Sequence, residues 1–375
     1  MFSLKHAGGE LTTQEVQYRR GLFQGDALSP LLFCLSVTPL PFGLRNTTGY
    51  PARFLTNPAT HLMFVDDLKI YASGAKALGQ SLKVVERITT AIGMRIGAQK
   101  CATACLRKGK RTEASDYSIT EDVIKELIEG QTYKYLGIHQ TIRSDPEKVR
   151  RALGEVYKRR LHQIWKAQMS GRNKIHATNI WAVSLFRYYF SSPLKWTKIS
   201  LRDLDRATRA ILRKHRGHYR GASVERLCLK SRSGGRGLQS LSQTYQREII
   251  AAVAYLVGSA DPIHQSIVEH QQWMKGMHHH SLLAEAEKAV QELEMGASLE
   301  REQIQEVGAK KLAKVASQAQ QQQLMDALQA KTIHGVFMKT SRKPTRDFEL
   351  THLWLRWGKQ RAETEALVQH RMESS

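Results

Sequence analysis

The sequence predicts an α+β protein, in which a small part that mixes strands and helices precedes a longer helical part. Short apolar runs bounded by turn residues fill the first 142 residues. Helical periodicity dominates after residue 145. With 375 residues and 41% apolar content, the chain can bury the cores of two or three domains. We expect domains at 1–142, 143–260 and 261–375, the last of them helical, charged and glutamine-rich.

The first part should contain short strands around two helices. Residues 1–19 read as two strands that turn at Gly8-Gly9. A helix should begin near Ser29, with Pro30 in its first turn, and end at Pro39 and Pro41. Further elements are expected as a strand pair at 62–65 and 68–71, a helix at 75–92 that ends before Gly93, and a second strand pair within 131–138.

The second part should be built from helices with recognisable starts. Asp145 followed by Pro146 predicts an N-cap, and the helix it opens should reach about residue 168. A second helix is expected at 174–190, where we expect the aromatic side chains to lie in the core. Ser200 with Asp203 resembles a capping box that opens a third helix, 201–215.

The charge of the chain predicts a polyanionic partner. The net charge is +23, and residues 143–220 alone hold 20 Lys and Arg against 5 Asp and Glu. Such a block is typical of nucleic-acid binding, with an anionic membrane surface as the rival. No apolar stretch is long enough to span a membrane and no signal peptide is visible. We therefore expect an intracellular protein of the nucleus or cytoplasm that is neither secreted nor membrane-bound.

The four cysteines indicate no metal or disulfide framework. They are Cys34, Cys101, Cys105 and Cys228, and none belongs to a CxxC pair. Cys101 and Cys105 are four residues apart, but no second pair completes a zinc site. Ordinary buried or free thiols are the expectation.

Two adjacent aspartates, Asp66 and Asp67, interrupt the apolar segment 61–71. Neighbouring carboxylates repel each other and lose hydration when buried, unless a positive group compensates them. One interpretation is a hairpin turn, where Asp is common. The other is a site for a divalent cation, which prefers oxygen ligands.

Four motifs in order resemble the reverse transcriptases of non-LTR, LINE-like retrotransposons. They are Arg20 to Phe33, with Gln24-Gly25-Asp26 and Leu28-Ser29-Pro30; Phe64-Val65-Asp66-Asp67; Gly93 to Lys100; and Tyr133 to Ile138. The resemblance implies a partial palm, an antiparallel sheet with helices, over 1–142. It also implies a basic helical thumb over 143–260. The group II intron maturases share the palm motifs and are a weaker family rival.

The resemblance assigns roles to particular residues. Asp66 and Asp67 would be the metal-binding pair, with two Mg²⁺ ions in the complete family site, and Lys100 a further catalytic candidate. The partners would be an RNA template, a DNA primer or target DNA, and a dNTP. Substrate-binding residues would be Arg20, Gln24, Gly25 and Phe64, together with Tyr135, Leu136 and Gly137 at the primer end.

One expected element of that site does not occur in the sequence. The family places a further aspartate on a strand before the Gln-Gly loop, and residues 1–19 contain no aspartate. The fingers segment is not recognisable either. We therefore expect RNA-directed DNA polymerase chemistry in the parent protein but little or none from this chain alone. A non-catalytic retroelement remnant that binds nucleic acid is the alternative, and a gene fragment without a stable fold is a third possibility.

Overall fold

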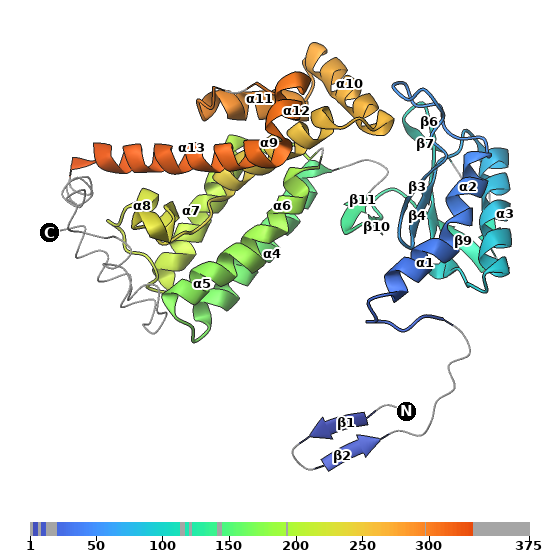
Figure 1. Cartoon of the computed structure of the whole chain (residues 1–375), viewed down its shortest axis with the longest axis horizontal. Coiled ribbons are helices and arrows are strands. Elements are labelled where there is room, and N and C mark those ends of the chain that lie inside the picture. The colour runs from blue at the N-terminus through green and yellow to red at the C-terminus, as the bar shows by residue number, and fades with distance from the viewer. Residues whose placement is uncertain are drawn as a thin grey trace. The chain divides into compact units, whose positions relative to one another are not determined.

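The computed structural model describes residues 3–6, 9–12, 21–112, 117–119, 122–140, 145–192, 194–296 and 298–332. The chain divides into two compact units, residues 1–144 and 145–375, each described here by itself (Figure 1). Helices and small sheets occur together, so the α+β class is confirmed. Arg20 lies outside the described residues. Among those described, no helix has the length and apolar character needed to cross a membrane.

The strands of the first unit form short, separate ladders. Four of these are antiparallel pairs, and the fifth is a three-stranded sheet in which β5 and β9 run parallel. The strands predicted for this unit thus form small ladders. The pairs are β1 (Ser3–His6) with β2 (Gly9–Thr12), β3 (His61–Phe64) with β4 (Asp67–Ile70), β6 (Cys105–Arg107) with β7 (Lys110–Thr112), and β10 (Tyr133–Tyr135) with β11 (Ile138–Gln140). The three-stranded sheet has the order β5 (Ala102–Thr103), β9 (Asp122–Glu126), β8 (Tyr117–Ile119).

Within the described residues of this unit, three α-helices accompany the strands: α1 (Ser29–Val37), α2 (Pro39–Arg45) and α3 (Ala75–Ala91). Helix α1 ends at Val37, just before Pro39 as predicted, but Pro39 then occupies the first turn of α2, a helix that the sequence did not predict. A proline is tolerated there, since the first-turn N–H groups have no partner within the helix. Helix α3 ends as predicted, with Gly93 at φ +72° just beyond it. Leu40, Leu44 and Val85 form the centre of one small core between α2 and α3.

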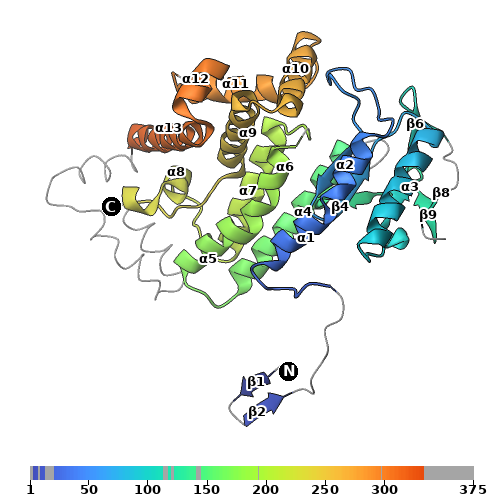
Figure 2. The ribbon, with the colours of Figure 1, turned by 45° about the vertical axis from the view of Figure 1, so that its right-hand side comes forward.

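The second unit is an assembly of helices on one large core (Figures 1 and 2). That core joins helices on both sides of residue 260, and α13 packs along α9. Its α-helices are α4 (Pro146–Lys166), α5 (Gly171–Ala177), α6 (Ser184–Phe190), α7 (Lys198–Lys214), α8 (Val224–Cys228), α9 (Leu241–Gly258), α10 (Pro262–Gly276), α11 (Leu282–Glu292), α12 (Arg301–Val307) and α13 (Ala309–Ala330).

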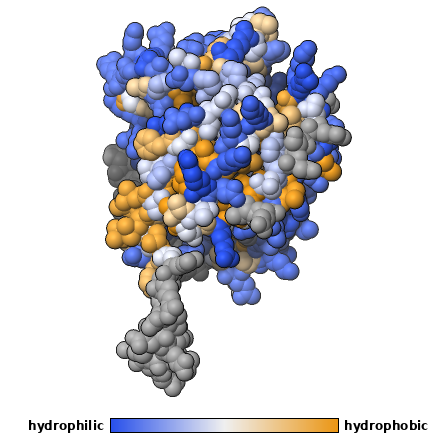
Figure 3. Space-filling view, turned by 90° about the vertical axis from the view of Figure 1, so that its right-hand side faces the viewer, coloured by the Kyte–Doolittle hydropathy of each residue, from blue (hydrophilic) through white to orange (hydrophobic). Residues whose placement is uncertain are grey.

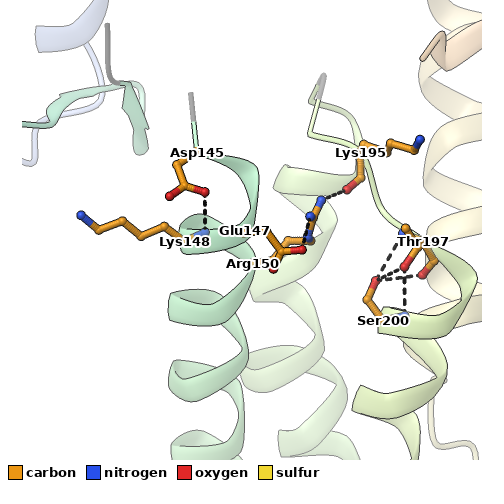
Figure 4. Close-up of polar contacts among 7 residues, drawn as sticks. All are labelled: Asp145, Glu147, Lys148, Arg150, Lys195, Thr197 and Ser200. Atoms are coloured by element: carbon orange, nitrogen blue, oxygen red, sulfur yellow. Dashed lines mark hydrogen bonds and ion pairs between the residues drawn. The ribbon is translucent and has the colours of Figure 1, made fainter. Parts of the chain in front are cut away.

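Two details of the helical part differ from the sequence prediction. The capping box of α7 is formed by Thr197 and Ser200, three residues before the predicted one (Figure 4). Asp203 instead pairs with Arg206 within the helix. Helix α5 begins at Gly171 and continues without a break through a π-helical segment, Thr178–Val183, into α6. A π segment inserts an extra residue into the turn and is frequent at functional sites.

Candidate active-site hairpin and basic surface

The aspartate pair lies at the tip of the β3–β4 hairpin. Phe64 pairs with Asp67, so the two turn residues are Val65 and Asp66. The predicted turn at Asp66-Asp67 is therefore wrong by one residue, and Asp67 is the first residue of β4. Both carboxylates are exposed. The alternatives of a turn and a metal site are compatible, because the turn itself presents Asp66.

The turn holds Val65 in an unusual backbone conformation. Val65 has φ +55°, whereas Asp66 does not have a positive φ. Positive φ at the first of two turn residues is the pattern of a type II′ turn, which favours glycine. For a β-branched residue this conformation is a genuine outlier, of the kind that clusters at functional sites. The carboxylate of Asp66 is thus presented by a strained turn.

The two faces of the hairpin have different surroundings. Met63, Leu68 and Ile70 pack against the core between α2 and α3. Residues paired directly across an antiparallel ladder share a face, so Phe64 and Asp67 lie together on the opposite one. Phe64 is exposed there. Apolar side chains are also visible on the face of the molecule drawn in Figure 3. The apolar packing fixes the hairpin and leaves the carboxylates accessible.

The hairpin tip has the donor set that Mg²⁺ uses. Among the described residues, neither Asp66 nor Asp67 forms an ion pair, and no third carboxylate, imidazole or thiol gathers with them. Mg²⁺ is commonly held by one or two carboxylates, while water and substrate phosphates complete the coordination. Two adjacent exposed carboxylates therefore fit the ion.

A second hairpin, β10–β11, is attached to the first through Lys69. The Lys69 Nζ donates a hydrogen bond to the Gln140 Oε1 at 2.7 Å, and it lies 5.4 Å and 5.6 Å from the ring centres of Tyr71 and Tyr135. The Tyr135 hydroxyl donates to the Leu62 carbonyl at 3.4 Å. Burial lowers the pKa of Lys69. The predicted residue Tyr135 is therefore buried between the hairpins, where it supports β3 and β4.

Lys69 and Gln140 were not among the residues singled out from the sequence. The available signal was a lysine two positions after Asp67 in an otherwise apolar strand, because alternate strand residues share a face. The turn of the second hairpin has special backbone conformations. Leu136 and Gly137 have φ +46° and +80°, which is the pattern of a type I′ turn.

The loop before α1 carries the predicted substrate residues Gln24 and Gly25. Both are exposed, and Gly25 has φ +101°. A Cβ at Gly25 would meet no atom of the chain within 4 Å. Backbone conformation therefore selects glycine here, and the space beside it is open. Among the described residues, Gln24 and Gly25 form no hydrogen bond with Asp66 or Asp67.

Lys100 is the last residue of a short 3₁₀ helix, Ala98–Lys100. Its backbone N–H donates to the Gly97 carbonyl at 2.9 Å, and its side chain is exposed. Within the described part of the chain, the Lys100 side chain has no ion pair with either aspartate.

We call residues 143–220 the basic block. All five acidic residues of this block form ion pairs or cap helices. Glu147, Glu155 and Asp203 pair with Arg150, Lys158 and Arg206, each three residues further on. Asp145 caps α4 by accepting from the Lys148 backbone at 3.1 Å (Figure 4). Asp205 accepts from the Leu241 and Ser242 backbone N–H groups at the start of α9, and from the hydroxyls of Ser240 and Ser242. Five acids cannot neutralise the 20 cations of residues 143–220, so the block keeps a strong positive charge.

Comparison with known proteins identifies the class of protein. Residues 2–140 match the family described as "Reverse transcriptase (RNA-dependent DNA polymerase)". The chain is also 27% identical over 241 residues to the "Retrovirus-related Pol polyprotein from type-2 retrotransposable element R2DM" of Drosophila melanogaster. It is 29% identical over 238 residues to the corresponding R2 polyprotein of Popillia japonica, and 30% identical over 125 residues to that of Nasonia vitripennis.

The chain is therefore similar to the reverse transcriptase family over residues 2–140. More particularly, it is related to the R2 group of non-LTR retrotransposon proteins, which confirms the resemblance found in the sequence. The matches cover 62%, 61% and 32% of this chain. They cover only 22%, 38% and 12% of the three relatives, so the chain corresponds to a minor part of each.

Proposed function

We propose that this chain supplies part of an RNA-directed DNA polymerase: the carboxylate hairpin of the palm and a basic helical region that serves as thumb. The observation that carries the proposal is the β3–β4 hairpin, which presents Asp66 and Asp67 from a strained turn on a packed support. Such a rigid presentation is what a phosphoryl-transfer site requires, because its catalysis consists of positioning and charge stabilisation.

In this proposal, Asp66 and Asp67 hold Mg²⁺. The bound ion would neutralise phosphate charge and make the primer 3′ hydroxyl more acidic. Gln24 and Gly25 line the pocket of the nascent base pair, while Tyr135 and Lys69 keep the β10–β11 hairpin against β3 and β4. Lys100 is proposed to meet phosphate. The surface cations of residues 143–220 contact the backbone of the template and primer, which needs charge but no particular sequence.

Titration with Mn²⁺, a paramagnetic substitute for Mg²⁺, tests the metal site directly. We expect weak binding to the whole chain that Asp66→Asn lowers at least severalfold, because one of two carboxylate ligands is lost. Electron paramagnetic resonance reports the free ion. Asp122→Asn, which alters an exposed carboxylate at the start of β9, should leave binding unchanged. Equal affinity of the wild type and the Asp66 variant would argue against this site.

The alternative is a protein that binds nucleic acid without chemistry. It is favoured by the two-carboxylate site, since no third metal-binding group gathers with Asp66 and Asp67 in the described part of the chain. A primer-extension assay on an RNA template separates the two. We propose that this chain alone gives little or no extension. Metal-dependent extension that Asp66→Asn abolishes would show that it is a complete polymerase.

A further inference from the structure

One exposed aromatic cluster on the second unit is left unexplained by core packing. The sequence predicts that the aromatic residues of the helix ending at Phe190 are buried. Phe186 and Phe190 are fully buried, but Trp181 is 44% exposed and Tyr188 is 49% exposed. Ile180, beside Trp181, is 58% exposed. The prediction holds for one face of the helix and is wrong for the other.

The exposed side chains lie in and after the π-helical segment. Ile180 and Trp181 both lie within Thr178–Val183, and Tyr188 follows about two turns later on α6. Trp181 and Tyr188 are both exposed. We call Ile180, Trp181, Tyr188 and the neighbouring Arg160 of α4 the Trp181 platform.

Arg160 holds the Trp181 residue in two ways. Its guanidinium carbon lies 5.2 Å from the centre of the Trp181 ring, within the range of a cation–π contact. Its Nη1 also donates a hydrogen bond to the Trp181 carbonyl at 2.6 Å. The ring is therefore fixed at one edge of an exposed surface, and a cation lies next to it. A fixed ring loses little side-chain entropy when a ligand stacks on it.

The sequence segment that contains the platform has no acidic residues. No Asp or Glu occurs between Glu155 and Asp203, a segment that contains half of α4 and the whole of the long helix that includes the π segment. Arg159 and Arg172 are exposed in this segment. The platform thus combines an exposed indole ring with a nearby arginine, in a long segment without acidic residues. These features suit a ligand that has both flat aromatic faces and negative charge. An unpaired nucleotide has both.

We propose that the Trp181 platform stacks a base of single-stranded RNA or DNA whose phosphates are held by the surrounding cations. The proposal rests on the nucleic-acid binding proposed above for the basic region. It adds a site with a defined ligand chemistry: a base face on Trp181, with Ile180 and Tyr188 widening the apolar surface. Stacking of this kind tolerates any base, because every base has a π face.

The decisive variant is Trp181→Leu, which keeps an apolar side chain but removes the ring. Fluorescein-labelled 12-mers of oligo(U) and oligo(dT) serve as probes, and anisotropy gives the affinity at several salt concentrations. We expect Trp181→Leu to weaken binding of both about 5- to 100-fold. The slope of log affinity against log salt should stay unchanged, since stacking releases no counterions. Trp181→Phe should retain most of the affinity.

The controls separate the possible failures. Tyr255→Ala removes another exposed aromatic side chain, on α9, and should have no effect. Thermal unfolding monitored by circular dichroism checks that Trp181→Leu is folded. If Trp181→Leu binds as tightly as the wild type, the platform is an apolar docking surface for protein or an idle one, and our inference is overturned. If the wild type binds neither oligonucleotide, the proposed nucleic-acid binding itself is wrong, and the platform fails with it.

Discussion

At the scale of single residues, the second unit buries a histidine among arginines. His218 is only 6% exposed. Burial lowers its pKa to about 4, and Arg236, Arg213 and Arg209 add to the effect. The neutral form is therefore the one compatible with the fold. Because the unfolded chain titrates near the ordinary pKa of about 6.5, it binds more protons than the folded chain between about pH 4 and 6.5.

This difference predicts that the protein loses stability as the pH falls through that window. Stability rises with pH wherever the unfolded state holds more protons, so the contribution of His218 is complete above about pH 6.5. By pH 5 it should have fallen by about 2 kcal/mol. Urea unfolding at pH 7 and pH 5 measures the change. The variant His218→Gln should lose most of this pH dependence, and an identical dependence in that variant would show that another group is responsible.

At the scale of elements, the start of α4 depends on one side chain. Asp145 accepts from the Lys148 backbone N–H, Pro146 occupies the first turn, and Glu147 lies near the positive end of the helix dipole (Figure 4). We expect Asp145→Ala to lower the free energy of unfolding by about 1 kcal/mol. Chemical denaturation followed by circular dichroism measures this. Asp145→Asn keeps a capping oxygen and should cost much less; an equal loss in both variants would indicate a role in charge instead of capping.

Elements with strong local signals can be predicted from the sequence, and those decided by packing cannot. The cap at Asp145, the glycine after α3 and the strands on either side of the aspartates follow from side-chain chemistry over a few residues. The capping box of α7 is harder to place, because Thr197 and Ser200 are both good N-cap residues. Only the path of the preceding chain decides that Ser200 is the third residue of the helix and not its N-cap.

The exposed ring of Trp181 shows the same limit more clearly. Bulky aromatic residues are usually core residues, but Trp181 is exposed while Phe186 and Phe190 are buried. The candidate site also has one part that the sequence predicts and one part that it does not. Asp66 and Asp67 can be identified from the sequence, whereas the contact between Lys69 and Gln140 joins residues 71 positions apart and depends on the tertiary fold.

At the scale of the whole molecule, the excess positive charge predicts salt-dependent binding of nucleic acid. If the protein contacts about five phosphates of a single strand, a plot of log affinity against log salt concentration should have a slope of about −3.5. The double variant Arg159→Ala with Lys166→Ala should make this slope shallower by about 1.4, because two phosphate contacts are lost. Anisotropy with labelled oligo(U) measures both slopes.

A matched pair of substitutions tests whether position matters as well as charge. Lys310→Ala with Lys311→Ala removes the same charge from exposed positions in α13, outside the basic block. That variant should keep the wild-type slope. Equal reductions in the two double variants would mean that net charge, and not the surface of residues 143–220, governs binding.

The engagement of all five acidic residues in the basic block restricts how its electrostatics can be altered. Replacing exposed lysines or arginines lowers the charge and disturbs little packing. Removing Asp145 or Asp205 would raise the charge, but it would also remove the hydrogen bonds that hold the first turns of α4 and α9. Both in evolution and in engineering, the affinity of this surface for polyanions can therefore be reduced more easily than it can be increased.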